Sequence, residues 1–349
     1  GDWVVDRTKL PGGLEDVAER VNRLGMKFGL WFEPEMVSPE SELYRKHPDW
    51  CLHVPDRHRS EARNQLILDF SRQDVCDAII EKIADILNSA PIEYVKWDMN
   101  RHMTEIGSAL LPPERQRETA HRYMLGLYRV MEELTSQFPH ILFESCSGGG
   151  GRFDPGSLYY MPQTWTSDNT DAISRLRIQY GTSLVYPISA MGAHVSAVPN
   201  HQTHRITPLQ TRGHAAMSGN FGYELDLTKL SEEEKKEVRQ QVALYKDNRE
   251  LIQFGEFYRL LSPFEHNGAA WMFVSEDQRE ALVVYFQILT QANAPFGRRL
   301  KLNGLDPTKK YQLEGEERYF TGDQLMYIGL PLPQLTGDFQ SYIWKFTEK

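Results

Sequence analysis

Four polar side chains follow an apolar segment in the first third of the chain, and their types could carry out chemistry. The segment 92–95 predicts a short buried strand, and Lys96, Asp98, Asn100 and Arg101 come directly after it. A buried strand that stops in such residues holds them at the end of a sheet, where water and substrate reach them. We therefore expect a site at this strand end.

Lys96 and Asp98 are separated by one residue, so in a strand both side chains point to the same face. A cation that close favours the ionised form of a carboxylate. A nucleophile needs this form, so the spacing indicates Asp98 as a nucleophile. The alternative is a purely structural Lys–Asp pair, because ion-pair networks also perturb carboxylates.

A second carboxylate, Asp168, has no obvious cation beside it and lies near Trp165 in the sequence. Burial against an aromatic ring favours the protonated form of a carboxyl group, which suits a proton donor. Asp171 is the rival for this role, but its place before the next predicted helix suits an N-cap. Two carboxylates that face each other across a barrel mouth are what glycoside hydrolysis requires, so Asp98 and Asp168 predict a glycosidase.

Other polar groups near strand ends have plainer interpretations. Glu33 and Glu35 could be catalytic, but Pro34 separates them and Arg63 could neutralise one of them, so we expect them to support a site. The glycines of 148–151 lack the Gly-Lys-Ser/Thr ending of a phosphate-binding loop. They either let backbone amides approach a ligand's hydroxyl groups or form a plain tight turn.

No metal and no cofactor are expected from the sequence. Four histidines are crowded together, but they lack the short fixed spacing of zinc ligands, and hydrogen bonding in loops is the expected role. These residues are His194, His201, His204 and His214.

The elements that must position these groups alternate between strand and helix. Predicted strands at 26–32, 66–70, 92–98, 141–145, 163–166, 184–188 and 215–220 are separated by helical patterns, the last of them near 231–254. Such alternation implies a parallel sheet, and the spacing suits an α/β protein with a (β/α)8 TIM barrel. We expect residues 1–255 to form this catalytic barrel, apparently without its first strand.

From residue 256 to residue 349 the pattern changes to short alternating strands separated by turn signals. Strands are expected at 258–261, 270–274, 281–288, 300–302, 311–313, 325–328 and 342–346. No helical pattern interrupts them, which predicts a C-terminal antiparallel β-sandwich domain.

Composition excludes several classes of protein. The chain has 349 residues with a net charge of −9, and no basic stretch makes nucleic acid a probable partner. No apolar run approaches the ~18 residues of a membrane span. Three cysteines without metal-type spacing suggest free thiols in a reducing, cytoplasmic compartment.

Three motifs resemble those of bacterial α-galactosidases of glycoside hydrolase family 36. They are Lys96–Arg101, Glu144–Gly150 and Trp165–Asp171, in the family's order on the predicted strands. The resemblance covers essentially the whole chain. It implies a retaining α-galactosidase that removes terminal α-1,6-linked galactose from melibiose and raffinose-family sugars by double displacement.

By the same resemblance, Asp98 matches the family's nucleophile and Asp168 its acid/base. We add Trp165 to the substrate-binding set, because sugar sites use aromatic rings as stacking platforms. The other positions that match the family's galactose pocket are Trp31, Arg63, Lys96, Asn100, Cys146 and Gly148.

The chain also departs from the family pattern. Family members carry an N-terminal β-sandwich that helps to build tetramers, then a first barrel strand ending in Asp-Asp-Gly-Trp, and this sequence begins after that motif. The aspartates that bind the 4- and 6-hydroxyl groups are therefore not in it. We expect that the missing N-terminal part acts as a partner, that the protein is a homotetramer, and that these residues alone have little activity.

Three other functions stay open from the sequence. A galactosyltransferase or transglycosidase would use the same glycosyl-enzyme with a sugar in place of water. An inactive fragment could bind sugar through its aromatic residues or serve a structural role. A metal-dependent barrel hydrolase is the last alternative function, and insensitivity of the activity to chelators would exclude it.

Overall fold

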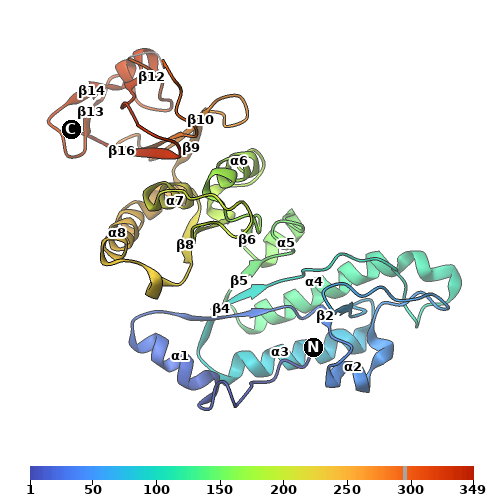
Figure 1. The fold of residues 1–349 in the computed structure, drawn as a ribbon. Coiled ribbons are helices and arrows are strands. Elements are labelled where there is room, and N and C mark those ends of the chain that lie inside the picture. Colours follow the sequence, from blue (N-terminus) through green and yellow to red (C-terminus); the bar gives the residue numbers. More distant parts are fainter. Residues whose placement is uncertain (294–296) are drawn as a thin grey trace. The chain divides into compact units, whose positions relative to one another are not determined.

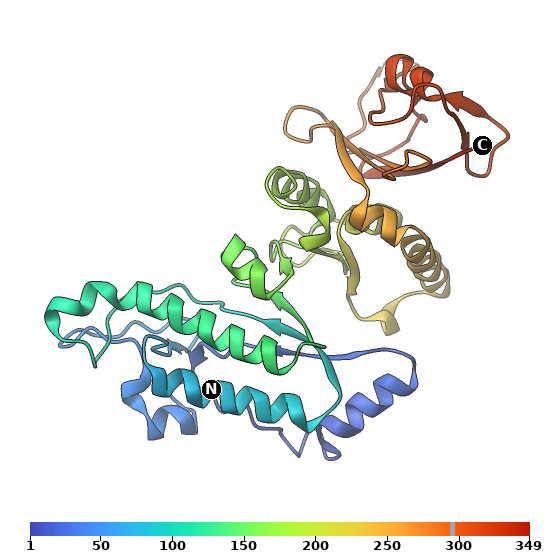
Figure 2. The same ribbon diagram turned by 180° about the vertical axis from the view of Figure 1, so that it is seen from behind.

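The computed structural model describes residues 1–293 and 297–349. They form two compact units, residues 1–165 and 166–349. Figure 1 shows both in colours that follow the sequence, and Figure 2 shows the same ribbon from behind. Each unit has a hydrophobic core of its own.

The first unit is built on a parallel sheet. Its strands, in spatial order, are β1 (Phe28–Phe32), β4 (Ile92–Trp97), β5 (Leu142–Ser145) and β6 (Gln163–Trp165). The helices of this unit are α1 (Gly13–Arg23), α2 (Glu42–Lys46), α3 (Gln73–Ser89), α4 (Thr119–Gln137) and α5 (Pro155–Tyr160). Helices α3 and α4 lie side by side (Figures 1 and 2).

Helix α3 forms because its apolar residues recur at helical spacing. Val75, Ile79, Ile83 and Leu87 lie on one face and are all buried. Helix α4 approaches the segment before α3 very closely at Gly126. A Cβ atom added to Gly126 would lie 1.8 Å from the carbonyl oxygen of Phe70. Only glycine permits this approach.

One predicted barrel strand is not part of the parallel sheet. The strand expected at 66–70 is the short β3 (Leu66–Ile67), and it pairs antiparallel with β2 (Met36–Val37). A short apolar run is compatible with any buried extended segment, so its hydrophobicity does not identify its partner.

The second unit begins with parallel β/α elements. Helix α6 (Ala172–Thr182) precedes β7 (Met191–Ser196), and α7 (Leu209–Ala216) precedes β8 (Asn220–Glu224), which pairs parallel with β7. Helix α8 (Glu232–Phe254) starts at Ser231 with a capping box. The Ser231 side chain accepts a hydrogen bond from the Glu234 N–H, and the Glu234 side chain accepts one from the Ser231 N–H.

An antiparallel domain follows in the same unit. Its six-stranded sheet has the order β14-β13-β16-β11-β10-β9, and β12 (Arg299–Leu300) pairs with β15 (Leu330–Pro331) beside it. The strands of the larger sheet are β9 (Glu256–Leu261), β10 (Gly268–Val274), β11 (Glu280–Gln287), β13 (Lys310–Leu313), β14 (Tyr319–Thr321) and β16 (Gln340–Glu348). Parallel β/α elements followed by an antiparallel β domain confirm the predicted fold class.

Three strand predictions in this unit are wrong. The segment 184–188 contains Pro187 and forms turns that lead into a 3-10 turn, and the strand β7 starts only at Met191. Residues 215–220 end α7 and lead into β8, because a short run of small apolar residues suits a helix as well as a strand. Residues 324–328 form a short π-helix instead of a strand, and β14 was not predicted.

The predicted domain boundary at 255/256 falls inside the second unit, directly after α8. Helices α7 and α8 contact strands of the antiparallel sheet. The indole N–H of Trp271 on β10 donates to the Ser218 hydroxyl at 2.7 Å, and both side chains are buried. The sheet is therefore packed against these helices, and the boundary stays a prediction.

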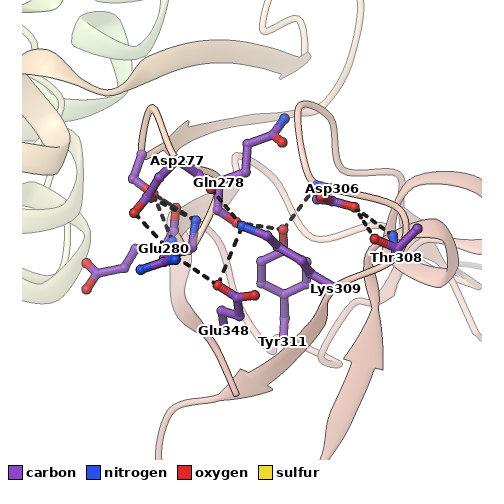
Figure 3. Close-up of polar contacts among 10 residues, drawn as sticks. Asp277, Gln278, Glu280, Asp306, Thr308, Lys309, Tyr311 and Glu348 are labelled. Atoms are coloured by element: carbon purple, nitrogen blue, oxygen red, sulfur yellow. Dashed lines mark hydrogen bonds and ion pairs between the residues drawn. The ribbon is translucent and has the colours of Figure 1, made fainter.

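A polar network holds the loops at one end of the antiparallel sheet (Figure 3). Tyr311 is completely buried, and its hydroxyl donates to the Gln278 carbonyl at 2.7 Å and accepts from the Asp306 N–H at 3.0 Å. Lys309 donates to the Asp277 carbonyl at 2.7 Å and lies 3.5 Å from a Glu348 carboxylate oxygen. The network thus links the β10–β11 turn, the loop before β13 and the end of β16.

Replacing Tyr311 by phenylalanine tests this network. The Tyr311→Phe variant keeps the buried ring but removes two hydrogen bonds, to the Gln278 carbonyl and from the Asp306 N–H. At about 0.5–1.5 kcal/mol for each bond, the free energy of unfolding should fall by about 1–3 kcal/mol. Denaturant unfolding measures the change. The matched control is Tyr342→Phe, since Tyr342 is 40% exposed and should tolerate loss of its hydroxyl within about 0.5 kcal/mol. Equal effects of both variants would contradict the assignment.

Candidate active site

The carboxylate of Asp98 is held at the end of β4 by three hydrogen-bond donors. Its Oδ2 accepts from Trp31 Nε1 at 3.0 Å and from Asn100 Nδ2 at 2.7 Å, and its Oδ1 accepts from the Met99 N–H at 2.8 Å. The Asp98 N–H continues the ladder to β1 through the Phe32 carbonyl at 2.8 Å. The structure therefore places the predicted residues Asp98, Trp31 and Asn100 together, and it fixes the orientation of the carboxylate.

The expected ion pair between Lys96 and Asp98 is wrong. Lys96 Nζ lies 3.3 Å from Glu144 Oε1, and it lies 4.9 Å from the centre of the Trp165 ring. Strand β4 ends at Trp97, so Asp98 lies outside the strand and the alternation of side chains no longer applies to it. The predicted residues Lys96 and Trp165 are close to each other, and Glu144 is the anion that neutralises Lys96.

The segment after β5 contributes Cys146 and an open glycine turn. Cys146 is buried, and burial together with the neighbouring Asp98 raises the pKa of its thiol to about 12. Gly148 has φ +54°, and a Cβ built on it would meet no atom within 4 Å. The turn is therefore tight, as one of the two sequence interpretations proposed, and it leaves space at Gly148.

Glu33 hydrogen-bonds the segment that carries Asp98. It accepts from the Asn100 N–H at 2.9 Å and from Gln65 Nε2 at 2.7 Å. Arg63 is exposed and has φ +55°, and the expected neutralisation by Arg63 is not seen in the described contacts of Glu33.

Glu35 is completely buried and supports the glycine turn. Arg152 donates to it through both terminal nitrogens, at 2.9 and 2.8 Å, and Trp97 Nε1 donates at 2.9 Å. Tyr123 contributes a further hydrogen bond through its hydroxyl. This bidentate ion pair fixes the residue that directly follows Gly148–Gly151 in the chain.

In the second unit, Asp171 is the N-cap of α6, as expected. Its carboxylate accepts from the Ser174 N–H at 2.9 Å, is nearly fully buried and forms an ion pair with Arg205. Asp168 is exposed, so the burial that the sequence argument assumed for it is wrong. The structural role of Asp171 nevertheless leaves Asp168 as the better candidate for proton transfer.

Several polar residues of the first unit were not predicted as parts of the site. Tyr94 and Gln163 both donate to Glu144 Oε2, the latter at 2.6 Å. Glu144 lay inside a motif that the sequence had marked, but nothing local indicated its partner. Strand register is the signal that could have found it, because β4 pairs Lys96 directly with Glu144 of β5.

The crowded histidines do not form a metal site. Among the residues that the structure describes, no group of three or more His, Cys, Asp or Glu side chains is arranged to hold a metal ion. His214 is buried on α7, and its Nδ1 lies 2.8 Å from the Ser341 hydroxyl of β16. Burial lowers the pKa of His214 to about 4. In the described part of the chain, no helix is both long and apolar enough to cross a membrane.

Comparisons with known proteins identify the family. Residues 1–255 match the model named Melibiase, and residues 268–346 match the glycosyl hydrolase family 36 C-terminal domain. The chain belongs to glycoside hydrolase family 36.

This family 36 chain is 73% identical over 345 residues to α-galactosidase AgaA of Geobacillus stearothermophilus and 54% identical over 346 residues to α-galactosidase 1 of Pediococcus pentosaceus. In each case 99% of this chain aligns with 47% of the relative, so the chain spans about half the length of these relatives. A crystal structure of AgaA aligns with all of this chain, and the aligned part is 48% of the AgaA chain. The identity is 72% and the TM-score is 0.98. An α-galactosidase structure from Lactobacillus brevis also gives a TM-score of 0.98, at 47% identity.

Removing the charge of Glu35 should destabilise the first unit strongly. The Glu35→Gln variant leaves the largely covered Arg152 guanidinium without its anion, which costs about 3–5 kcal/mol in comparable buried pairs. Denaturant unfolding measures the loss. The matched control is Glu118→Gln, since Glu118 also accepts from two arginines, Arg115 and Arg122, but does so at the surface. The Glu118→Gln variant should leave the free energy of unfolding unchanged. A large loss of stability in this control would contradict the assignment of the Glu35 effect to burial.

His214 should make stability depend on pH. Its pKa in the folded state is about 4, and an unfolded histidine titrates near 6.5, so the unfolded chain binds the proton first as the pH falls. The contribution of His214 to the free energy of unfolding is constant above about pH 7 and is lost as the pH falls from about 6.5 to about 4. Between pH 7.5 and 5 the wild type should lose about 2 kcal/mol more than His214→Asn. The exposed His201, changed to Asn, serves as the control and should leave the pH profile unchanged.

Proposed function

We propose that this protein is a retaining α-galactosidase that removes terminal α-1,6-linked galactose from melibiose and raffinose-family oligosaccharides. The observation that carries the proposal is the Asp98 carboxylate, fixed by Trp31 and Asn100 at the carboxyl end of a parallel strand in a family 36 chain. Catalytic groups of parallel barrels come from such strand ends.

Two solved structures of AgaA variants support the choice of both carboxylates. In one, with stachyose, an aspartate is replaced by alanine, and in the other, with raffinose, an aspartate is replaced by asparagine. In that enzyme's numbering the two positions are 70 residues apart, which is also the separation of Asp98 and Asp168.

The proposed reaction has two displacements. Asp98 attacks the anomeric carbon of galactose while Asp168 gives its proton to the leaving oxygen, so the glycosidic bond breaks and a galactosyl ester forms on Asp98. Asp168 then takes a proton from water, which attacks the same carbon and releases galactose with its original anomeric configuration.

Galactose binding is assigned to side chains around Asp98. Lys96 and Asn100 offer N–H donors, and the backbone at Gly148 is open to an approaching hydroxyl group. Trp31 is 46% exposed beside the carboxylate, which suits a stacking surface for a sugar ring. Arg63, Cys146 and Trp165 complete the proposed set.

Transfer to a sugar acceptor in place of water is the alternative reaction, and an inactive sugar-binding fragment is the alternative without chemistry. Domain limits of 1–255 and 256–349, a homotetramer, a cytoplasmic location and a requirement for the N-terminal part of the protein also stay predictions. The three buried free cysteines are consistent with a reducing compartment.

Trapping with an activated 2-deoxy-2-fluorogalactoside tests the nucleophile. Peptide mapping should find the label on Asp98, and label on another residue would overturn the assignment. Asp98→Ala should lower kcat for an aryl α-galactoside by a factor on the order of 10⁴ or more. Asp168→Ala should slow the hydrolysis of galactosides with poor leaving groups by a factor of about 10²–10⁴. Hydrolysis of galactosides with activated aryl leaving groups should slow much less. If the full-length protein binds galactose but shows neither turnover nor label, the sugar-binding alternative is favoured.

A further inference from the structure

Glu144 occupies a central place in a row of side chains on the parallel sheet. Its side chain is 2% exposed, and strand register sets it between Lys96 on β4 and Gln163 on β6. Trp31 on β1 pairs in turn with Lys96. Residues paired across neighbouring strands project to the same face, so these four side chains share one face of the sheet.

The two oxygens of Glu144 have different surroundings. Oε2 accepts from the Tyr94 hydroxyl and from Gln163 Nε2 at 2.6 Å. Oε1 is buried and has no hydrogen-bond partner among the described residues, and Lys96 Nζ lies 3.3 Å from it. A buried carboxylate that loses its cation is strongly destabilised, so Glu144 restricts the ammonium group of Lys96 to this position. The Trp165 ring, 4.9 Å away, favours the same position through a cation–π contact.

This arrangement also explains why Lys96 does not pair with Asp98. Trp31 Nε1, Asn100 Nδ2 and the Met99 N–H all donate to Asp98, and all three donors are uncharged. Uncharged donors orient a carboxylate without the charge neutralisation of a direct ion pair, so more negative charge stays available for attack on carbon.

We propose that Glu144 is a positioning residue. It holds the Lys96 ammonium beside the site and leaves the other N–H donors of Lys96 free for sugar hydroxyl groups. It also keeps Lys96 out of a direct ion pair with Asp98. The part that concerns sugar rests on the proposed function. The part that concerns Lys96 rests only on the contacts of the first unit.

The first experiment needs no activity. Reductive methylation of the 349-residue chain with formaldehyde, followed by peptide mapping, gives the rate at which Lys96 reacts relative to the other lysines. In Glu144→Gln the amine loses its anionic partner, so Lys96 should react several-fold faster while the other lysines are unchanged. The matched control is Asp69→Asn, since Asp69 is a fully buried carboxylate bonded to Ser71 and Ser108. An unchanged Lys96 rate in Glu144→Gln, or an equal rise in Asp69→Asn, would overturn the proposal.

The second experiment is a double-mutant cycle on aryl α-galactoside hydrolysis with Lys96→Ala, Glu144→Gln and the double variant. Glu144→Gln should lower kcat/KM by a factor on the order of 10², as for a small displacement of a binding group. In the Lys96→Ala background, Glu144→Gln should change kcat/KM by no more than about twofold, because both substitutions remove the same interaction. Effects that multiply would overturn the proposal. This cycle is measured on the full-length protein, because these residues alone are expected to have little activity. Absence of turnover in the full-length wild type would refute the proposed function, and the methylation rates would still decide the role of Glu144.

Discussion

The register of a parallel sheet determines which side chains meet at the candidate site. Strands β1, β4, β5 and β6 pair so that Trp31, Lys96, Glu144 and Gln163 form one row. The row brings the Lys96 ammonium against the nearly fully buried Glu144 carboxylate, which would be unstable without a cation. Each neutralises the other, and Asp98, just beyond the end of β4, is left with uncharged donors. The chemical state of the site thus follows from strand pairing.

Buried ion pairs fix the segments that follow the strands. In the first unit, Glu35 holds Arg152 at the end of the glycine turn, and in the second unit Asp171 both caps α6 and pairs with Arg205. Segments of this kind are usually the more mobile parts of a protein. A charge pair at their base restricts them without occupying the space at their tips, where a ligand would bind.

The sequence predicts features whose cause is local. The helical pattern near 231–254 identified α8, the abrupt end of a buried strand identified Asp98, and the position of Asp171 before a helix identified its cap. Features that depend on distant residues were not predictable in the same way. The partner of Lys96 lies on the next strand, the antiparallel partner of β3 lies before it in the chain, and exposure of Asp168 depends on the folded surface.

The short apolar segments of the second unit show the same limit. Residues 215–220 are apolar enough for either a helix or a strand, and packing of α7 against β7 and β16 decides between them. The family motifs point to candidate site residues, although they say nothing of these contacts. A resemblance therefore reports which residues matter, while the physical reason comes from the contacts.

The protonated thiol of Cys146 has a consequence for covalent labelling of this chain. A thiol with a pKa of about 12 offers almost no thiolate at neutral pH, and thiolate is the form that reacts with electrophiles. Cys51 and Cys76 are buried with pKa values raised to about 12 as well, so a cysteine-directed warhead would find no reactive group on this chain. Epoxide or aziridine groups, which esterify carboxylates, suit Asp98 better as covalent probes.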